Sequence, residues 1–161
     1  MTRKLRNKLD YEIIYEHLRD AEFNKDKFIN VENNNITDIK DKPIEGGFWA
    51  SPVDSKYSWR KVFSGMDLWE QNTFFRFTLS NNAKILYINS IESIKLIPKE
   101  FIISFDKVLN LDFEKLSTVY DALHFDPSND ECLNEIMPSW QCDCILIFNP
   151  DIIETINKKI M

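Results

Sequence analysis

The sequence predicts an α+β fold in which short strands outnumber short helices. Apolar runs of strand length lie at 74–79 and 84–89, and residues 10–19 alternate with the period of a strand. Strands and helices do not alternate regularly along the chain, so a doubly wound parallel sheet is not expected. We therefore expect split mixed or antiparallel β-sheets with flanking short helices.

The first expected strand runs from Asp10 to Arg19. Its residues fall on two faces, with Tyr11, Ile13, Tyr15 and His17 on one and Glu12, Ile14 and Glu16 on the other. A helix is a competing interpretation, because Glu, Leu and Arg favour helices. The polar segment 24–41 is expected to be a loop with a short ordered piece around Phe28.

The middle of the chain predicts a short helix and then a hairpin. Ser58 can cap a helix over 58–63 by accepting from an unpaired backbone N–H, and Gly65 is expected to end it. The apolar runs 74–79 and 84–89 are joined by a segment rich in Asn, which tolerates the positive φ of a tight turn. These runs are therefore expected to pair as a hairpin.

The last third predicts helices and strands in turn. A helix begins near Ser90 and ends near Pro98, and a second helix, capped by Asp112, runs from Phe113 to about Val119 and buries Phe113, Leu116 and Val119. A strand at 120–125, a loop with one helical turn at 126–138 and a strand at 141–148 follow. A helical tail is expected from Asp151.

Composition bounds the class of protein. The chain has 161 residues, 43% of them hydrophobic and 13% aromatic, which is enough for one domain over 1–161 with a real core. Residues 1–9 and 155–161 are the candidates for fraying. No apolar run approaches the roughly 20 residues that cross a bilayer, so we expect neither a membrane span nor an export signal. An odd number of cysteines, two of them close on one strand, fits a reducing cytoplasm.

The charge argues against broad nucleic-acid binding. The formal net charge is −6, so extended contact with phosphates is not expected. The basic N-terminal residues, Arg3, Lys4, Arg6 and Lys8, are interpreted as a solvated tail, with a nucleic-acid arm as the alternative.

Several catalytic motifs are absent or weak. With three glycines in the chain, neither a G-x-G-x-x-G turn nor a Walker loop can form. Cys142 and Cys144 lack the usual spacing of zinc ligands, so buried apolar cysteines are favoured and no metal site is predicted. Ser51, His17 and Asp143 could be assembled into a triad, but no nucleophile elbow surrounds any serine.

Three segments remain as a candidate site. In Gly46-Gly47-Phe48-Trp49-Ala50-Ser51-Pro52, the glycines allow close approach of backbone to a ligand and the indole offers a stacking face, although a turn feeding a core strand explains the same residues. His17 is either a catalytic residue or a hydrogen-bonded half-buried residue. Alternation would place Gln141 and Asp143 on one face and Cys142, Cys144, Leu146 and Phe148 on the core face.

In this order, the three segments resemble the signature of the ADP-ribosyltransferase-like superfamily. The matching pieces are Ile14-Tyr15-Glu16-His17, Gly46 to Pro52, and Gln141-Cys142-Asp143-Cys144-Ile145-Leu146. With downstream Trp59, Tyr120-Asp121 and Trp140, the chain is similar from about Tyr11 to Ile153 to a group of small bacterial and phage-type proteins associated with that fold. The family fold is a split pair of mixed sheets with NAD in the cleft between them.

The resemblance implies a role for each matching residue. His17 would contact a ribose hydroxyl of NAD, Ser51 would support its strand, and Trp49 or Tyr57 would stack on nicotinamide. Asp143 would stand beside the nicotinamide ribose, where a carboxylate stabilises the positive charge of an oxocarbenium-like transition state. Gly47 and Gln141 belong to the same NAD-binding set. Arg19 is a rival to His17, because the glycine expected after the histidine is missing.

The expected activity is NAD-dependent mono-ADP-ribosyl transfer, with NAD as substrate and a macromolecular acceptor, most simply a protein. A toxin, an effector or a phage protein that modifies its host would have this activity. The family acid is typically Glu, and Asp143 is one methylene shorter. The alternative is therefore a catalytically inactive, acidic interaction or inhibitor protein of the anti-defence or nucleic-acid-mimic type on the same fold. A third reading is a nucleotide binder or hydrolase that uses the same cleft.

Overall fold

A computed structural model describes residues 12–18, 20, 22–63 and 74–155. Within these ranges the protein is α+β, with a seven-stranded mixed sheet, a two-stranded sheet and four short α-helices. The pattern of short strands and helices along the sequence predicted this α+β class. The expected fraying of 1–9 and 155–161 concerns residues outside the described ranges, except Thr155. No helix in the described part of the chain is long and apolar enough to cross a membrane.

The large sheet has the strand order β4-β7-β8-β2-β1-β3-β9. Its strands are β1 (Tyr15–Leu18), β2 (Phe48–Pro52), β3 (Phe74–Leu79), β4 (Ile85–Ile88), β7 (Ala122–Phe125), β8 (Cys144–Ile147) and β9 (Ile153–Thr155). All neighbouring strands are antiparallel except β4 and β7, which are parallel.

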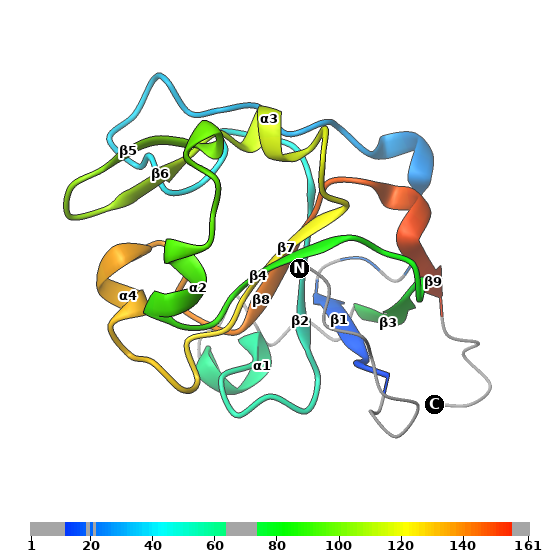
Figure 1. The fold of residues 1–161 in the computed structure, drawn as a ribbon. Coiled ribbons are helices and arrows are strands. Elements are labelled where there is room, and N and C mark those ends of the chain that lie inside the picture. The colour runs from blue at the N-terminus through cyan, green and yellow to red at the C-terminus, as the bar shows by residue number, and fades with distance from the viewer. Residues whose placement is uncertain (1–11, 19, 21, 64–73, 156–161) are drawn as a thin grey trace.

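Short helices and a two-stranded sheet make up the rest of the described elements. They are η1 (Lys25–Lys27), α1 (Trp59–Val62), α2 (Ile91–Lys95), η3 (Lys99–Phe101), α3 (Phe113–Leu116), α4 (Leu133–Ile136) and η4 (Pro150–Ile152), with the hairpin of β5 (Ile102–Phe105) and β6 (Leu109–Leu111). In Figure 1, α2, α3, α4 and the β5–β6 pair gather on the side of β4, β7 and β8, away from β1, β3 and β9.

Strand β8 shows why the sheet is buried on both faces. Cys144 and Leu146 belong to one apolar cluster, which includes residues of α2, α3 and α4. Ile145 and Ile147 belong to a second cluster, with Phe75 and Phe77 of β3. Successive side chains of a strand point to opposite faces, so the continuous apolar run Cys-Ile-Leu-Ile packs against a core on each side.

The contact between β1 and β2 is short and decides where the site lies. The two strands pair at Tyr15 with Pro52 and at Glu16 with Ser51, and the backbone N–H of Val53 continues the contact to Ile14. No residue of β1 beyond Glu16 has a register partner in β2. The ladder therefore ends in the middle of the sheet, at the residue before His17.

Local capping signals were read correctly. Ser58 caps α1 and accepts from the N–H of Lys61, and Asp112 caps α3 and accepts from the N–H of Lys115. Ser90 forms a capping box with Ser93, and α2 ends before Pro98 as expected. Each cap satisfies a backbone donor that a helix start leaves unpaired. Gly65, the expected end of α1, lies outside the described ranges.

The predicted hairpin is wrong in its pairing. Both strands form, but β3 pairs with β1 and β9, whereas β4 lies at the far edge of the sheet beside β7. The turn between them is closed by its own contacts, including the N–H of Ala83 on the carbonyl of Ser80. A turn of this kind reverses the chain without fixing which strands pair across it, and the long-range partners decide the register.

Three further boundaries differ from the prediction. Helix α3 ends at Leu116, so Val119 is exposed rather than buried. The expected helical tail from Asp151 is a short 3₁₀ turn followed by β9, whose register with β3 runs from Ile153 to Thr155. Strand β8 begins at Cys144, so residues 141–143 form a bend before it and do not alternate as strand residues.

Candidate functional site

An open cleft of about 1120 Å³ lies beside the end of the β1–β2 ladder. Four of the residues predicted to bind a ligand line it, namely His17, Gly47, Trp49 and Gln141. They come from β1, from the segment entering β2, and from the bend before β8. Its volume is slightly above the range of about 300–1,000 Å³ that is usual for small-molecule sites.

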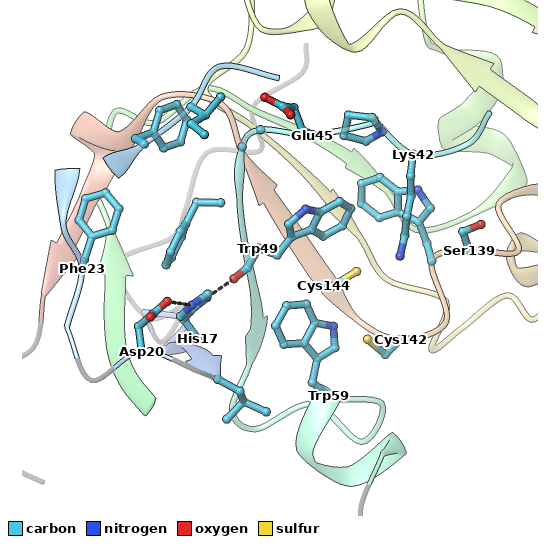
Figure 2. A pocket seen from close by; sticks show the side chains of 18 of the residues that line it. His17, Asp20, Phe23, Lys42, Glu45, Trp49, Trp59, Ser139, Cys142 and Cys144 are labelled. Atoms are coloured by element: carbon cyan, nitrogen blue, oxygen red, sulfur yellow. Dashed lines mark hydrogen bonds and ion pairs between the residues drawn. The ribbon is translucent and has the colours of Figure 1, made fainter. Parts of the chain in front are cut away.

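His17 is fixed in the cleft wall by contacts on every side. Its Nδ1 donates to the backbone oxygen of Trp49 at 2.8 Å, and its Nε2 lies 2.8 Å from Oδ2 of Asp20 (Figure 2). The ring stacks on Phe48 with centroids 4.3 Å apart. A carbonyl and a carboxylate both accept, so each ring nitrogen of His17 faces an acceptor. Asp20 is exposed, so a ligand oxygen could displace its carboxylate and meet Nε2 of His17.

Trp49 forms a wall of the cleft, with a second indole behind it. Its ring centroid is 4.8 Å from that of Trp140, which is 1% exposed and donates from Nε1 to the carbonyl of Asp41. The ammonium of Lys42 lies 5.2 Å from the Trp49 centroid, a cation–π distance. Trp49 is thus backed by Trp140 and contacted by a cation. A ligand that stacked on its ring would share it with Lys42.

The glycine pair is explained by packing of the chain on itself rather than by approach to a ligand. Gly46 and Gly47 have φ of +87° and +75°. A Cβ at Gly46 would lie 2.0 Å from the backbone oxygen of Asn30, and one at Gly47 would lie 2.4 Å from Cδ1 of Leu146. The segment around Asn30 crosses directly over the pair, and the N–H of Gly47 donates to the carbonyl of Ile29. Both glycines still line the cleft.

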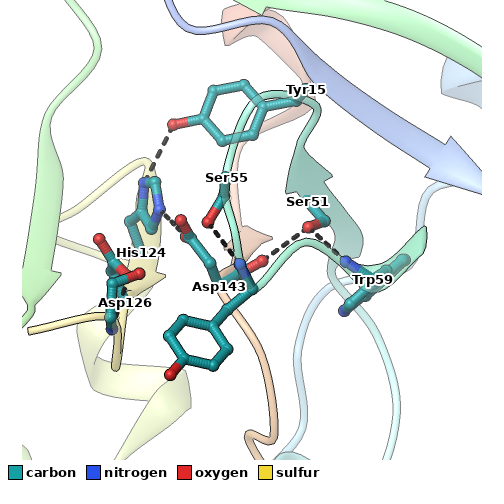
Figure 3. Close-up of polar contacts among 9 residues, drawn as sticks. Tyr15, Ser51, Ser55, Trp59, His124, Asp126 and Asp143 are labelled. Carbon is teal, nitrogen blue, oxygen red and sulfur yellow. Dashed lines mark hydrogen bonds and ion pairs between the residues drawn. The ribbon is translucent and has the colours of Figure 1, made fainter. Parts of the chain in front are cut away.

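Ser51 supports the site from outside the cleft. Its Oγ donates to the backbone oxygen of Asp143 at 2.7 Å and accepts from the N–H of Trp59 at 2.9 Å (Figure 3). This buried hydroxyl ties β2 to the bend before β8 and to the start of α1. Ser51, predicted to bind the cofactor and to support its strand, does not line the cleft, and its contacts join the neighbouring segments.

Asp143 points away from the cleft, contrary to its predicted catalytic position. Its Oδ1 accepts from Nε2 of His124 at 2.6 Å, and Nδ1 of His124 lies 3.0 Å from the hydroxyl of Tyr15 (Figure 3). All three side chains are buried. The expected pairing of faces fails because 141–143 is a bend, so Gln141 reaches the cleft while Asp143 turns into the core.

The remaining predicted contacts are divided. Tyr57 does not line the cleft, and its backbone carbonyl accepts from the N–H of Asp143. Gln141 is exposed and lines the cleft. Arg19 lies outside the described ranges.

The two cysteines, Cys142 and Cys144, line the cleft but are buried rather than reactive. Cys142 and Cys144 are each 2% exposed. Burial raises the pKa of the Cys144 thiol well above its usual range, and hydrogen bonding with Cys142 adds to the effect. A thiol that stays protonated is a poor nucleophile and a poor metal ligand. Among the described residues, no group of three or more His, Cys, Asp or Glu side chains could hold a metal ion.

Sequence reasoning gave no site role to Trp59 and Lys42 of the cleft, or to the buried His124. Trp59 and Lys42 both project into the cleft (Figure 2). Trp59 opens α1, directly after the cap Ser58. Lys42 stood in a polar loop with no pattern around it. His124 gave no signal, because its partners Tyr15 and Asp143 are distant in sequence.

The site can therefore hold a planar ring beside Trp59 and Trp49, an anionic group near Lys42 and a hydroxyl near His17.

Comparison of the chain with protein-family models, with curated proteins and with solved structures gave no match.

Proposed function

We propose that the cleft binds NAD and that the protein transfers ADP-ribose from NAD to a macromolecular acceptor. One observation carries the proposal. His17, Gly47, Trp49 and Gln141 were selected from separate segments, and all four line the same cleft. The strands of the three segments, β1, β2 and β8, are also direct neighbours in the sheet. An activity of the toxin, effector or phage host-modifying type would follow.

The chemistry sets a defined task for the cleft. The bond between nicotinamide and C1′ of its ribose breaks, nicotinamide leaves with the electron pair, and an acceptor nucleophile bonds C1′ and loses a proton. Planar nicotinamide or adenine fits beside the indoles of Trp59 and Trp49. The pyrophosphate fits the ammonium of Lys42, and a ribose hydroxyl fits Nε2 of His17.

The direct test is incubation of the protein with NAD labelled in its adenylate part, together with candidate acceptors. Wild type is expected to label an acceptor and to release nicotinamide, and His17→Ala is expected to reduce kcat/KM about tenfold or more, because a hydrogen bond to the ribose is lost. Lys99→Gln, a change at an exposed lysine with no contact to the cleft, is the control. Wild type that neither transfers label nor releases nicotinamide would refute the transferase.

Lys42→Gln tests the anionic part of the ligand. Removing the ammonium is expected to raise the Kd for NAD about tenfold, because a charge-assisted contact to pyrophosphate is lost. Affinity for nicotinamide riboside, which carries no phosphate, should stay within about twofold. Calorimetry measures both, and an equal loss for the two ligands would place Lys42 away from the phosphates.

A second function is favoured by the position of Asp143. Its carboxylate is buried against His124 and does not line the cleft, so the structure does not supply the expected acid beside a ribose. The alternative is an acidic interaction or inhibitor protein that keeps the cleft without transfer. Calorimetry separates the two: NAD binding without nicotinamide release, together with a stoichiometric protein partner, supports the second function.

A further inference from the structure

A second polar cluster lies on the opposite face of β1 from His17. Glu16 is 4% exposed, and its two carboxylate oxygens are each held by a different arginine. Oε1 accepts from Nε of Arg60 at 2.9 Å, and Oε2 accepts from Nε of Arg76 at 3.0 Å. A buried carboxylate needs such partners, because an unpaired charge is costly to bury. The cluster joins β1, β3 and α1.

Both guanidinium groups are held in place. Arg76 is the register partner of Glu16 across the β1–β3 ladder. The guanidinium carbons of Arg60 and Arg76 lie 5.2 Å and 5.4 Å from the ring centroid of Phe74. Each arginine is thus anchored at Nε and against one shared aromatic ring, so little side-chain freedom remains to be lost when a ligand binds.

The anchored arginines keep most of their donors. An arginine carries five N–H donors, and the contact with Glu16 uses the one at Nε. Within the described ranges, the terminal nitrogens of Arg60 and Arg76 have no hydrogen-bond partner, and both side chains reach solvent, with 50% and 32% of each exposed. Two positive charges meet one negative charge, which leaves a local surplus of positive charge in a chain of net charge −6.

Both arginines line a small cavity beside the large cleft. The cavity, of about 60 Å³, is lined by both arginines, Glu16 and Ser58 among others. Leu18 and Trp59 line this cavity and the large cleft alike. The two cavities therefore share part of their lining.

We propose that Arg60 and Arg76 form a binding site for a phosphate group. A guanidinium fork matches the oxygens of a phosphate monoester, and the carboxylate of Glu16 anchors both arginines at Nε. This proposal does not depend on whether NAD binds in the large cleft. A ligand that carries this phosphate would lie directly beside Trp59.

A purely structural role for the cluster makes a different prediction. In that case the arginines only neutralise Glu16, and substitution changes stability without any effect on anion binding. The two roles separate when phosphate binding and thermal stability are measured on the same variants.

The protein is titrated at constant ionic strength with inorganic phosphate, with thymidine 5′-monophosphate and with thymidine, and calorimetry measures the Kd of each. Both phosphates are expected to bind wild type and thymidine is not. Tighter binding of the mononucleotide identifies a phosphate ester as the ligand, and equal binding identifies free phosphate. Arg60→Gln is expected to weaken binding about tenfold, because charge-assisted hydrogen bonds are lost. Lys99→Gln, which removes one positive charge elsewhere, is expected to change it less than twofold.

Two further variants protect the test from misfolding. Arg60→Lys keeps the charge but loses the fork, so it should bind more weakly than wild type and more tightly than Arg60→Gln. Glu16→Gln should lower the melting temperature while phosphate affinity is kept or rises, because a negative charge beside the site is removed. Wild type that binds phosphate no more tightly than folded Arg60→Gln would overturn the proposal.

Discussion

Asp143→Ala is expected to lower the free energy of unfolding by about 3 kcal/mol. The carboxylate accepts a hydrogen bond from Nε2 of His124 inside the core. Removal of the carboxylate leaves that N–H donor buried with no acceptor. Asp143→Asn keeps an oxygen at the same place and should cost only about 1 kcal/mol. Urea denaturation with a linear fit measures both values.

The paired control and the double substitution sharpen this test. Asp20→Ala removes a carboxylate that also contacts a histidine but is exposed, so it should cost less than about 1 kcal/mol. In a double-substitution cycle, Asp143→Ala and His124→Ala should couple by about 1 kcal/mol or more, because they share one buried hydrogen bond. A stable Asp143→Ala protein that has lost only activity would contradict the structural role and restore Asp143 to the catalytic site.

Gly46→Ala is expected to destabilise the protein by about 3 kcal/mol or more. The residue has φ of +87°, where a Cβ is strained, and the new methyl would lie 2.0 Å from the backbone oxygen of Asn30. A backbone atom cannot turn aside as a side chain can. The crossing segment around Asn30 would have to move, and with it a wall of the cleft.

Gly47→Ala is the matched comparison. Its φ is also positive, but its nearest contact is the Cδ1 atom of Leu146, a side-chain end that can shift. We therefore expect a smaller loss than for Gly46→Ala, and thermal melting of the two variants side by side gives the order. The reverse order, or two losses below about 1 kcal/mol, would mean that the chain crossing is not as tight as described.

Local signals in the sequence predicted local structure well. Ser58 and Asp112 were predicted as helix caps, and each caps a helix. The capping oxygen acts on an N–H only a few residues away, so the information lies within one window of sequence. The alternation around Tyr15 likewise indicated β1 correctly, against the competing helix.

Long-range pairing could not be predicted in the same way. The turn after β3 reverses the chain, but the partner of β4 is β7, more than thirty residues further on. The β5–β6 hairpin was missed, because the helical spacing of Ile91, Ile94, Ile97 and Phe101 drew attention to the helix before it and no strand was assigned to 102–111. Strand β9 was missed because Asn149 and Pro150 resemble a helix start, and only the open edge of β3 makes the tail extended.

The candidate site was half visible for the same reason. His17, Trp49 and Gln141 stood out by residue type, and the cleft unites them. The face of Asp143 was derived from strand alternation, which holds only where a strand exists, and β8 begins one residue later. The Asp143 carboxylate instead turns toward Nε2 of His124, which is buried on the neighbouring strand β7.

A crystal structure of the protein with NAD tests the central claim most directly. The account predicts nicotinamide or adenine beside Trp59 and Trp49, pyrophosphate within hydrogen-bond distance of Lys42, and a ribose hydroxyl on Nε2 of His17 in place of Asp20. Asp143 should stay bonded to His124. An empty cleft at saturating NAD, or NAD bound elsewhere on the surface, would contradict the account.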